Sequence, residues 1–248
     1  MQRVELLAVP GLPMVKAGDD LARLIGERLT GELALRKGDV VVLAQKIVSK
    51  AEGRMVELST VKPSPRAIEL AAEVQKDPKL VELILSESVR VVRSRPNVLI
   101  VEHRLGFVMA NAGIDQSNVA PQDGVERALL LPKDPDASAA ALRAKLGATA
   151  LLIIDSFGRP WRRGTTGVAI GGAGLPAMLD LRGTPDLFGR TLQVTISAFA
   201  DEIAAAASLL MGQGNEGRPI VLVRGLDWHE PVSRAGTLLR PANEDLFQ

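Results

Sequence analysis

The fold depends most on the segment TALLIIDSFGRPWRRGTTGVAIGG, from Thr149 to Gly172. Its apolar start predicts a buried strand that ends on a carboxylate and a hydroxyl, Asp155 and Ser156. An Asx-type turn is the structural interpretation of such a strand end. The functional interpretation is a corner for metal and phosphate, because carboxylate and hydroxyl oxygens are hard ligands that suit Mg²⁺ or Mn²⁺.

Cations and glycines follow this strand directly. The cations are Arg159, Arg162 and Arg163, and the glycines are Gly164, Gly167, Gly171 and Gly172. Guanidinium groups bind phosphate or carboxylate through paired hydrogen bonds, and glycines let backbone N–H groups approach a ligand closely. The segment is therefore read as a loop, with the arginines as candidates for binding an anionic substrate.

Outward from this segment, strands and helices neither alternate strictly nor separate into blocks. Strands are expected within 3–10, 89–94, 97–113, 148–155 and 218–225, and at the starts of 39–53 and 191–214. Helices are expected over 19–35, 64–75, 77–88, 136–147 and the later part of 191–214, with Asp136 as a cap and Gly147 just past the helix end. This order favours an α+β fold over a doubly wound sheet.

The composition excludes several classes of protein. Among the 248 residues, 30 Lys and Arg balance 29 Asp and Glu, so the net charge of +1 favours no nucleic-acid partner. The absence of Cys excludes disulfides and thiolate chemistry and is typical of a cytoplasmic chain. No signal peptide and no apolar run of about 18 residues is visible, so no membrane association is expected.

Further polar clusters follow apolar runs. NAGIDQSNV places Asp115 and Asn118 after a predicted strand, either in an Asn- and Gly-rich turn or in a site where Asp115 shares a divalent metal with Asp155. Lys46 and Lys50 follow the strand at residue 39 onward, either as surface charges or as phosphate contacts.

Two loops and two histidines complete the candidates. The loop GQGNEG, 212–217, holds more glycines than a helix cap needs, which indicates a phosphate- or base-facing loop. Residues 10–13 form a rigid apolar loop that could also contact a flat heterocycle. His103 and His229 share no metal spacing and are read as structural or surface residues. No P-loop, no strand followed by GxGxxG, and no GxSxG motif is present.

The order of these motifs resembles the coenzyme F-420:L-glutamate ligase family. The resemblance rests on GLPMVKAGDDLA, GDVVVLAQKIVSKAEGR, NAGIDQSNV, IIDSFGRPWRRGTTGVAIG and ADEIAAAASLLMGQGNEG, and it extends from about Gly11 to Gly225. It implies a cytoplasmic GTP-dependent amide ligase that adds L-glutamate to the deazaflavin precursor of coenzyme F-420 and extends a γ-glutamyl tail. It also implies intertwined antiparallel sheets flanked by helices, in a single unit of two lobes over 1–248 that forms a homodimer and carries no appended nitroreductase domain.

The resemblance further implies the residues of the site. Nucleotide contacts are implied at Leu12, Pro13, Met14, Val15, Gln45, Lys46, Lys50, Asn118, Met211, Gly212, Gly214, Asn215, Glu216 and Gly217. A divalent metal, Mg²⁺ or Mn²⁺, is implied at Asp115, Asp155, Ser156 and Gln213, and the family pattern allows for a monovalent cation besides. Some relatives have Glu where Gln213 stands, so the neutral amide changes the charge balance here.

Other functions stay open at this point. One alternative is a related ligase that adds an amino acid to another carboxylate-bearing cofactor. Another is a non-catalytic protein that binds a nucleotide or a deazaflavin. Neither the general base nor the role of each arginine follows from the sequence.

Overall fold

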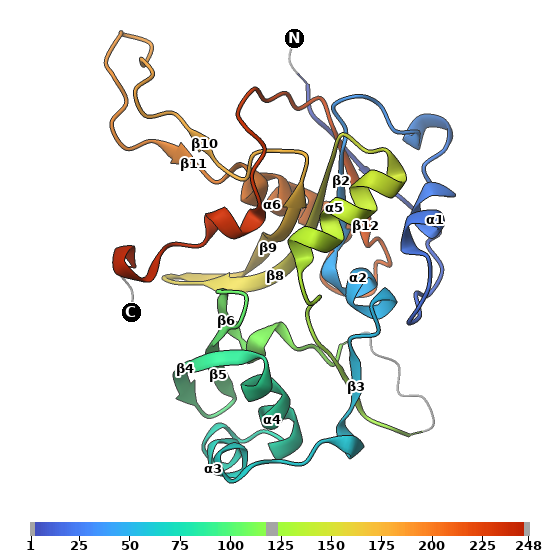
Figure 1. Ribbon diagram of the computed structural model, residues 1–248, viewed down its shortest axis with the longest axis vertical. Helices are drawn as coiled ribbons and strands as arrows, with labels where there is room; N and C mark the ends of the chain where they lie inside the picture. The colour runs from blue at the N-terminus through green and yellow to red at the C-terminus, as the bar shows by residue number, and fades with distance from the viewer. Residues whose placement is uncertain (1–2, 118–123, 246–248) are drawn as a thin grey trace.

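The fold is built around a mixed β-sheet with the strand order β1-β12-β2-β8-β9, at the centre of Figure 1. Its strands are β1 (Glu5–Ala8), β2 (Val40–Ala44), β8 (Ala150–Arg159), β9 (Arg162–Ala173) and β12 (Ile220–Arg224). Neighbours run antiparallel except β2 and β8, which are parallel. The computed structural model describes residues 3–117 and 124–245.

Helices cover both faces of this sheet. One face carries α1 (Leu21–Gly26), α2 (Gln45–Ala51) and α5 (Pro135–Leu146), and the other carries α6 (Phe199–Met211). Side chains alternate between the faces along each strand. In β2, Val41 and Leu43 therefore join the core under α1, α2 and α5. Val40 and Val42 join the core under α6.

A second section, in green and cyan at the bottom of Figure 1, has an apolar core of its own. It contains α3 (Pro65–Val74), α4 (Pro78–Ser86) and the sheet β4-β5-β6 (Ser88–Arg95, Val98–His103 and Val108–Ala110). The antiparallel pair β3 (Met55–Glu57) and β7 (Arg127–Leu129) connects it to the rest of the chain. The two-lobed single unit expected from the sequence stays a prediction.

Short elements complete the description. The strands β10 (Leu179–Asp180) and β11 (Ile196–Ser197) form an arm that projects from the body in Figure 1. The 3₁₀ turns are η1 (Gly31–Leu33), η2 (Leu58–Thr60), η3 (Asn111–Gly113), η4 (Ala235–Leu238) and η5 (Ala242–Glu244). The mixture of sheets and helices confirms the α+β class, although the parallel β2–β8 pair departs from a wholly antiparallel arrangement.

Local sequence explains where the helices of the second section begin. Ser64 accepts a hydrogen bond from the backbone N–H of Ala67, and Asp77 accepts bonds from the first turn of α4. Each helix then has Pro at its first position, where the missing N–H costs nothing. Both predicted helix starts are confirmed.

The cap predicted for the helix over 136–147 was wrong. Asp134, not Asp136, accepts the hydrogen bond from the backbone N–H of Ala137 and caps α5. Pro135 occupies the first helical position, so the residue before it is the cap. Asp136 instead accepts bonds from the backbone N–H groups of Gly172 and Ala235, and it thereby connects α5 to β9 and η4.

The glycine-rich segment after Asp155 was wrongly expected to be a loop. It forms the end of β8 and the strand β9, and Gly167 and Gly171 lie where helices approach the sheet closely. A Cβ at Gly167 would overlap the carbonyl group of Ala204 in α6, and a Cβ at Gly171 would overlap the backbone of Pro135 in α5. The glycines therefore serve packing in the middle of the strand.

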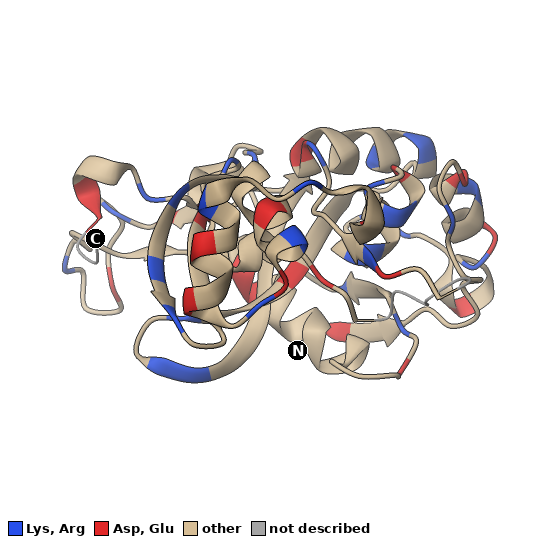
Figure 2. Ribbon diagram, turned by 90° about the horizontal axis from the view of Figure 1, so that it is seen from below, with Lys and Arg blue, Asp and Glu red and all other residues tan. Residues whose placement is uncertain are grey.

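Charged residues are spread over the whole molecule. Figure 2 shows acidic and basic residues interspersed along the ribbon, which agrees with the net charge of +1. Among the described residues, no helix is both long and apolar enough to cross a membrane.

Candidate functional site

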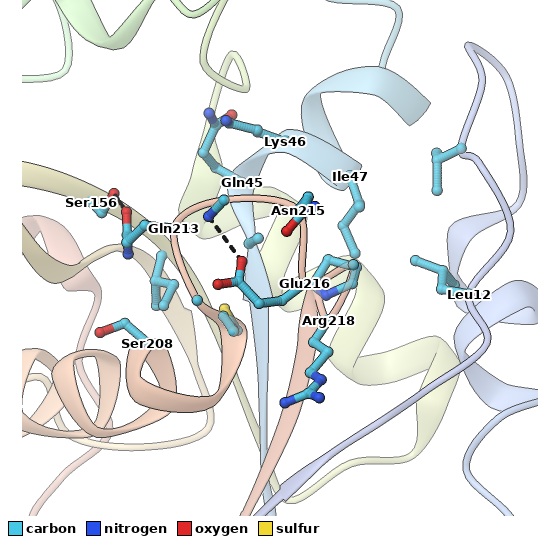
Figure 3. A pocket seen from close by; sticks show the side chains of 18 of the residues that line it. Leu12, Gln45, Lys46, Ile47, Ser156, Ser208, Gln213, Asn215, Glu216 and Arg218 are labelled. Carbon is cyan, nitrogen blue, oxygen red and sulfur yellow. Dashed lines mark hydrogen bonds between the residues drawn. The ribbon is translucent and has the colours of Figure 1, made fainter. Parts of the chain in front are cut away.

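A cavity of about 580 Å³ opens where β2 ends, and it is called the cleft below (Figure 3). Its lining comes from segments far apart in the sequence: 12–15, 44–47 with Lys50, 154–156, and 211–219 with Ser208. The parallel pairing of β2 and β8 places Ala44 opposite Ile154. The residues that come after Ala44 and after Ile154 therefore lie at the same wall of the cleft.

Asp155 and Ser156 line the cleft from inside β8, not from its end. The expected strand end was wrong because β9 continues to pair with β8, with Val168 opposite Asp155 and Gly167 opposite Ser156. The register of this pairing shifts just before Asp155, and such bulges re-aim side chains near functional sites. The structure thus brings this predicted pair to the cleft by a different local structure.

The carboxyl group of Asp155 is in an environment that disfavours its charge. Burial, with a smaller contribution from the negative charge of Asp115, raises the pKa of Asp155 to about 6, against the opposing effects of the backbone N–H of Ser156 and the charge of Lys46. A cation beside this carboxylate would relieve the penalty.

Asp115 lies beside the cleft wall and is paired with a cation of the chain. Its Oδ2 is 2.6 Å from Nζ of Lys46, and it also accepts hydrogen bonds from the backbone N–H and the hydroxyl of Ser117. Burial alone would raise the pKa of Asp115, but the hydrogen bonds from Lys46 and Ser117 outweigh burial and lower it. Among the described residues, Lys46 lines the cleft and Asp115 does not. Lys46 therefore connects Asp115 to the cleft.

The backbone before Asp115 is strained. Asn111, Ala112 and Gly113 all have positive φ angles, of 53°, 53° and 67°. Non-glycine residues in the left-handed region cost on the order of 1–3 kcal/mol each and persist where the surroundings hold them. Here the buried Ala112 and the contact of Gly113 with Leu131 fix the turn that leads to Asp115.

The polar residues after β2 lie on a helix, α2. Lys46 and Lys50 are four residues apart and therefore share one face of α2, which lines the cleft. Gln45 is buried, and its Oε1 accepts a hydrogen bond of 2.9 Å from the hydroxyl of Ser49. Burial lowers the pKa of Lys50, the charge of Lys46 lowers it further, and Asp115 partly offsets both.

The glycine loop 212–217 follows the C-terminal end of α6 and forms the opposite wall of the cleft. Gln213 lies beside β8, where its Oε1 accepts a hydrogen bond of 2.7 Å from the hydroxyl of Ser156 (Figure 3). Residues 12–15 add an apolar wall, and Arg28 Nε holds this segment by donating to the carbonyl oxygen of Gly11 at 2.8 Å.

The oxygen atoms of the cleft fit a divalent metal. The carboxylate of Asp155, the hydroxyl of Ser156 and the amide oxygen of Gln213 are hard donors that all line the cleft, and Ser156 and Gln213 are hydrogen-bonded to each other. No group of three or more His, Cys, Asp or Glu side chains suited to a metal occurs among residues 3–117 and 124–245. Hard oxygen donors of this kind suit Mg²⁺ or Mn²⁺, which commonly takes one or two carboxylates and completes its shell with ligand phosphates and water.

Other predicted residues lie elsewhere. Arg159, Arg162 and Arg163 lie at the exposed turn between β8 and β9, outside the lining of the cleft, and their role as substrate-anion contacts stays a prediction. Asn118 lies outside the described residues. His229 is exposed, as the sequence indicates.

His103 belongs to a charged network that sequence analysis did not anticipate. Its Nδ1 accepts a hydrogen bond from the backbone N–H of Leu105, and its Nε2 is 3.5 Å from Glu87. Arg54 and Arg104 also contact Glu87, at 2.9 and 3.0 Å. These residues are distant in sequence and share no motif spacing. Ser208 and Arg218 of the cleft were also missed, although Arg218 follows the glycine loop directly.

This arrangement defines a class of protein: an α+β chain whose cleft offers carboxylates, lysines and a glycine loop to a small anionic ligand, without a P-loop. Comparison with known proteins makes the class specific. The sequence profile of the family described as F420-0:Gamma-glutamyl ligase matches residues 11–225. The chain belongs to this family of ligases.

Relatives named Coenzyme F420:L-glutamate ligase are similar to this chain over nearly their whole length. The protein of Methanothermobacter thermautotrophicus is 49% identical, with 99% of each chain covered. That of Methanopyrus kandleri is 43% identical, covering 97% of this chain and 96% of the relative. That of Methanocaldococcus jannaschii is 38% identical, covering 100% and 98%.

Proposed function

We propose that this chain joins L-glutamate to a carboxylate of the deazaflavin precursor of coenzyme F-420 and then extends a tail of γ-linked glutamates, with GTP as co-substrate. The observation that carries the proposal is the cleft, in which segments from the whole length of the chain meet. Two lysines, a half-buried carboxylate and a glycine loop in one cavity suit a nucleotide phosphate chain with its metal.

The chemistry follows from the weak reactivity of a carboxylate. An oxygen of the acceptor carboxylate attacks the γ-phosphorus of GTP, the bond to the bridging oxygen breaks, and GDP leaves. The glutamate amine then attacks the carbonyl carbon of the acyl phosphate and expels inorganic phosphate, and the amine loses its proton. Positioning and electrostatics suffice for both steps, so no nucleophilic side chain is required.

The chain's own residues bind and orient the reactants. Lys46 and Lys50 neutralise phosphate oxygens from one wall of the cleft. Asp155, Ser156 and Gln213 would hold the divalent metal, and Asp115, which is paired with Lys46 in this structure, would be a further carboxylate ligand. When bound, the metal would supply positive charge against the developing charge of the transferred phosphoryl oxygens.

Phosphate release tests the proposal. We expect release of inorganic phosphate from GTP with Mg²⁺ or Mn²⁺ only when both L-glutamate and the deazaflavin acceptor are present. Replacing GTP by ATP should reduce turnover, since the resemblance implies selectivity for guanine. If phosphate is released at the same rate without glutamate and acceptor, the chain is a nucleotide-binding protein without the proposed ligase activity.

A further inference from the structure

The side chain of Glu216 folds back onto the glycine loop at the wall of the cleft (Figure 3). One of its carboxylate oxygens accepts a hydrogen bond of 2.8 Å from the backbone N–H of Gly214. Glu216 thus places an anion of the chain itself against a backbone donor that faces the cleft.

The surroundings of this carboxylate are those of an anion site. The backbone N–H groups of Glu216 itself and of Gly214 lower the pKa of Glu216, and the charge of Arg218 and the N–H of Gln213 add to this effect. Backbone N–H groups converging from a turn form a concavity that binds anions. The carboxylate therefore lies among donors that would equally suit a phosphate oxygen.

The glycine at the start of the loop makes room for this anion. Gly212 has a φ angle of 72°, in the left-handed region that favours glycine. A Cβ on residue 212 would overlap the carboxylate of Glu216, so the carboxylate occupies space that only a glycine leaves free. Because residues 213–217 of the loop are exposed, this side chain can leave without disturbing a buried core.

We propose that Glu216 is an internal competitor for the phosphate-binding surface of the loop 212–217, and that an incoming phosphate group displaces its carboxylate. The proposal rests on the proposed function, because it concerns a phosphate-bearing ligand in the same cleft. A phosphate group carries more charge and more acceptor oxygens than a carboxylate, so it gains more from the same donors. Displacement turns the Glu216 side chain out of the loop and leaves its N–H groups to the ligand.

Competition predicts that binding becomes tighter when the carboxylate is removed. We would measure the affinity for inorganic pyrophosphate and, separately, for GTP with Mg²⁺ by calorimetry in Glu216→Gln, Glu216→Ala and the unaltered chain. Affinity for both ligands should rise about three- to tenfold in Glu216→Ala, the range expected for losing one competing hydrogen bond. The affinity of Glu216→Gln should rise less, since the amide oxygen still accepts a hydrogen bond from the backbone N–H of Gly214.

A matched control removes the same charge elsewhere. Glu244 lies in the exposed η5 turn, outside the lining of the cleft. The variant Glu244→Gln should therefore leave both affinities unchanged. A rise equal to that of Glu216→Ala in this control would overturn the proposal, because net charge alone would then explain the effect. Unchanged or weaker binding in Glu216→Ala would also overturn it, since a direct ligand contact loses affinity on removal.

These results are distinguishable from failure of the proposed function. If the unaltered chain binds GTP and forms product while Glu216→Ala gains no affinity, only the competition is refuted. If the unaltered chain ligates glutamate without binding any nucleotide, the proposed use of GTP fails, and the competition with phosphate fails with it.

Discussion

At the scale of single residues, Asp115 and Asp155 differ although both are predicted metal ligands. The pKa of Asp115 is lowered by hydrogen bonds from Lys46 and Ser117 that outweigh burial, whereas burial and the charge of Asp115 raise the pKa of Asp155. The charged form of Asp155 is therefore costly to the folded protein, and that of Asp115 is not.

Substitution by Asn should separate these two roles. Asp155→Asn should melt higher than the unaltered chain at pH 7 without metal, because an unfavourable buried charge is removed. The penalty in the unaltered chain develops as the pH rises from about 3.8 through about 6, so the difference should vanish in acid. Thermal melts at pH 4 and pH 7.5 measure this.

Asp115→Asn provides the comparison within the same site. It breaks the ion pair with Lys46, so its melting temperature should not rise. Both variants should lose glutamate ligation by orders of magnitude while remaining folded, as two metal ligands would. Near-normal ligation in either variant would remove that residue from the metal site and return it to a structural role.

At the scale of elements, the hairpin of β8 and β9 organises the site. It places Asp155 and Ser156 at the cleft, and helices pack against its second strand over glycines. The atoms nearest to a Cβ added at Gly167 or Gly171 are backbone atoms of α6 and α5, which cannot move as a flexible side chain would.

Adding a methyl group at these glycines should push the helices off the sheet. Gly167→Ala and Gly171→Ala should each lower the free energy of unfolding by about 1–3 kcal/mol, as overpacking does in other cores. Gly158→Ala in the same hairpin is the control, since no atom lies within 4 Å of its Cβ position. Denaturant unfolding of the three variants tests this, and equal stability would show that β9 does not need its glycines.

Sequence patterns could predict elements whose signals are local. Ser64-Pro65 and Asp77-Pro78 mark the starts of α3 and α4, and apolar periodicity marks the central strands. The strand β9 could not be predicted, because the reason for its glycines is the approach of helices distant in sequence. The order of the motifs predicted most residues of the cleft. The contacts of Lys46 with Asp115 and of Ser156 with Gln213 join residues distant in sequence, so only the folded structure shows them.

At the scale of the whole molecule, the charged network around Glu87 joins the two sections. Glu87 follows α4, while Arg54 donates to the carbonyl oxygen of Leu131 and Arg104 to that of Lys133. Burial opposes the charge of Glu87, but hydrogen bonds from His103, Arg54 and Arg104 outweigh it and lower the pKa of Glu87 to about 2. Breaking such a partly buried network is costly because it leaves uncompensated charges.

This network should make stability depend on acid pH. The pKa of Glu87 is lower in the folded protein than its ordinary 4.5, so its contribution is complete above pH 4.5 and is lost as the pH falls towards 2. In Glu87→Gln, the free energy of unfolding should no longer contain this acid-dependent contribution, which is worth on the order of 3 kcal/mol. The exposed pair Arg66–Glu69 supplies the control Glu69→Gln; an identical pH profile in both variants would exclude the network as its source.

The arm formed by β10 and β11 bears on assembly, because large apolar side chains are exposed at its end. Leu187 is 99% exposed and Phe188 is 90% exposed, on a turn ordered by bonds from backbone N–H groups to Asp186. Contiguous exposed apolar surface is typical of interaction sites. We predict a homodimer by light scattering at micromolar concentration that Phe188→Ser weakens; a monomer of the unaltered chain would defeat this prediction.

The central claim of the proposed function is that the chain joins glutamate to the deazaflavin acceptor while GTP is converted to GDP and phosphate. Mass spectrometry of the acceptor, after incubation with the unaltered chain, L-glutamate, GTP and Mn²⁺, measures this outcome without an intermediate assay. We expect products heavier by one or more glutamyl residues, and no such products when GTP is omitted. An acceptor of unchanged mass in the complete reaction, or equal glutamyl addition without GTP, would refute the proposed reaction.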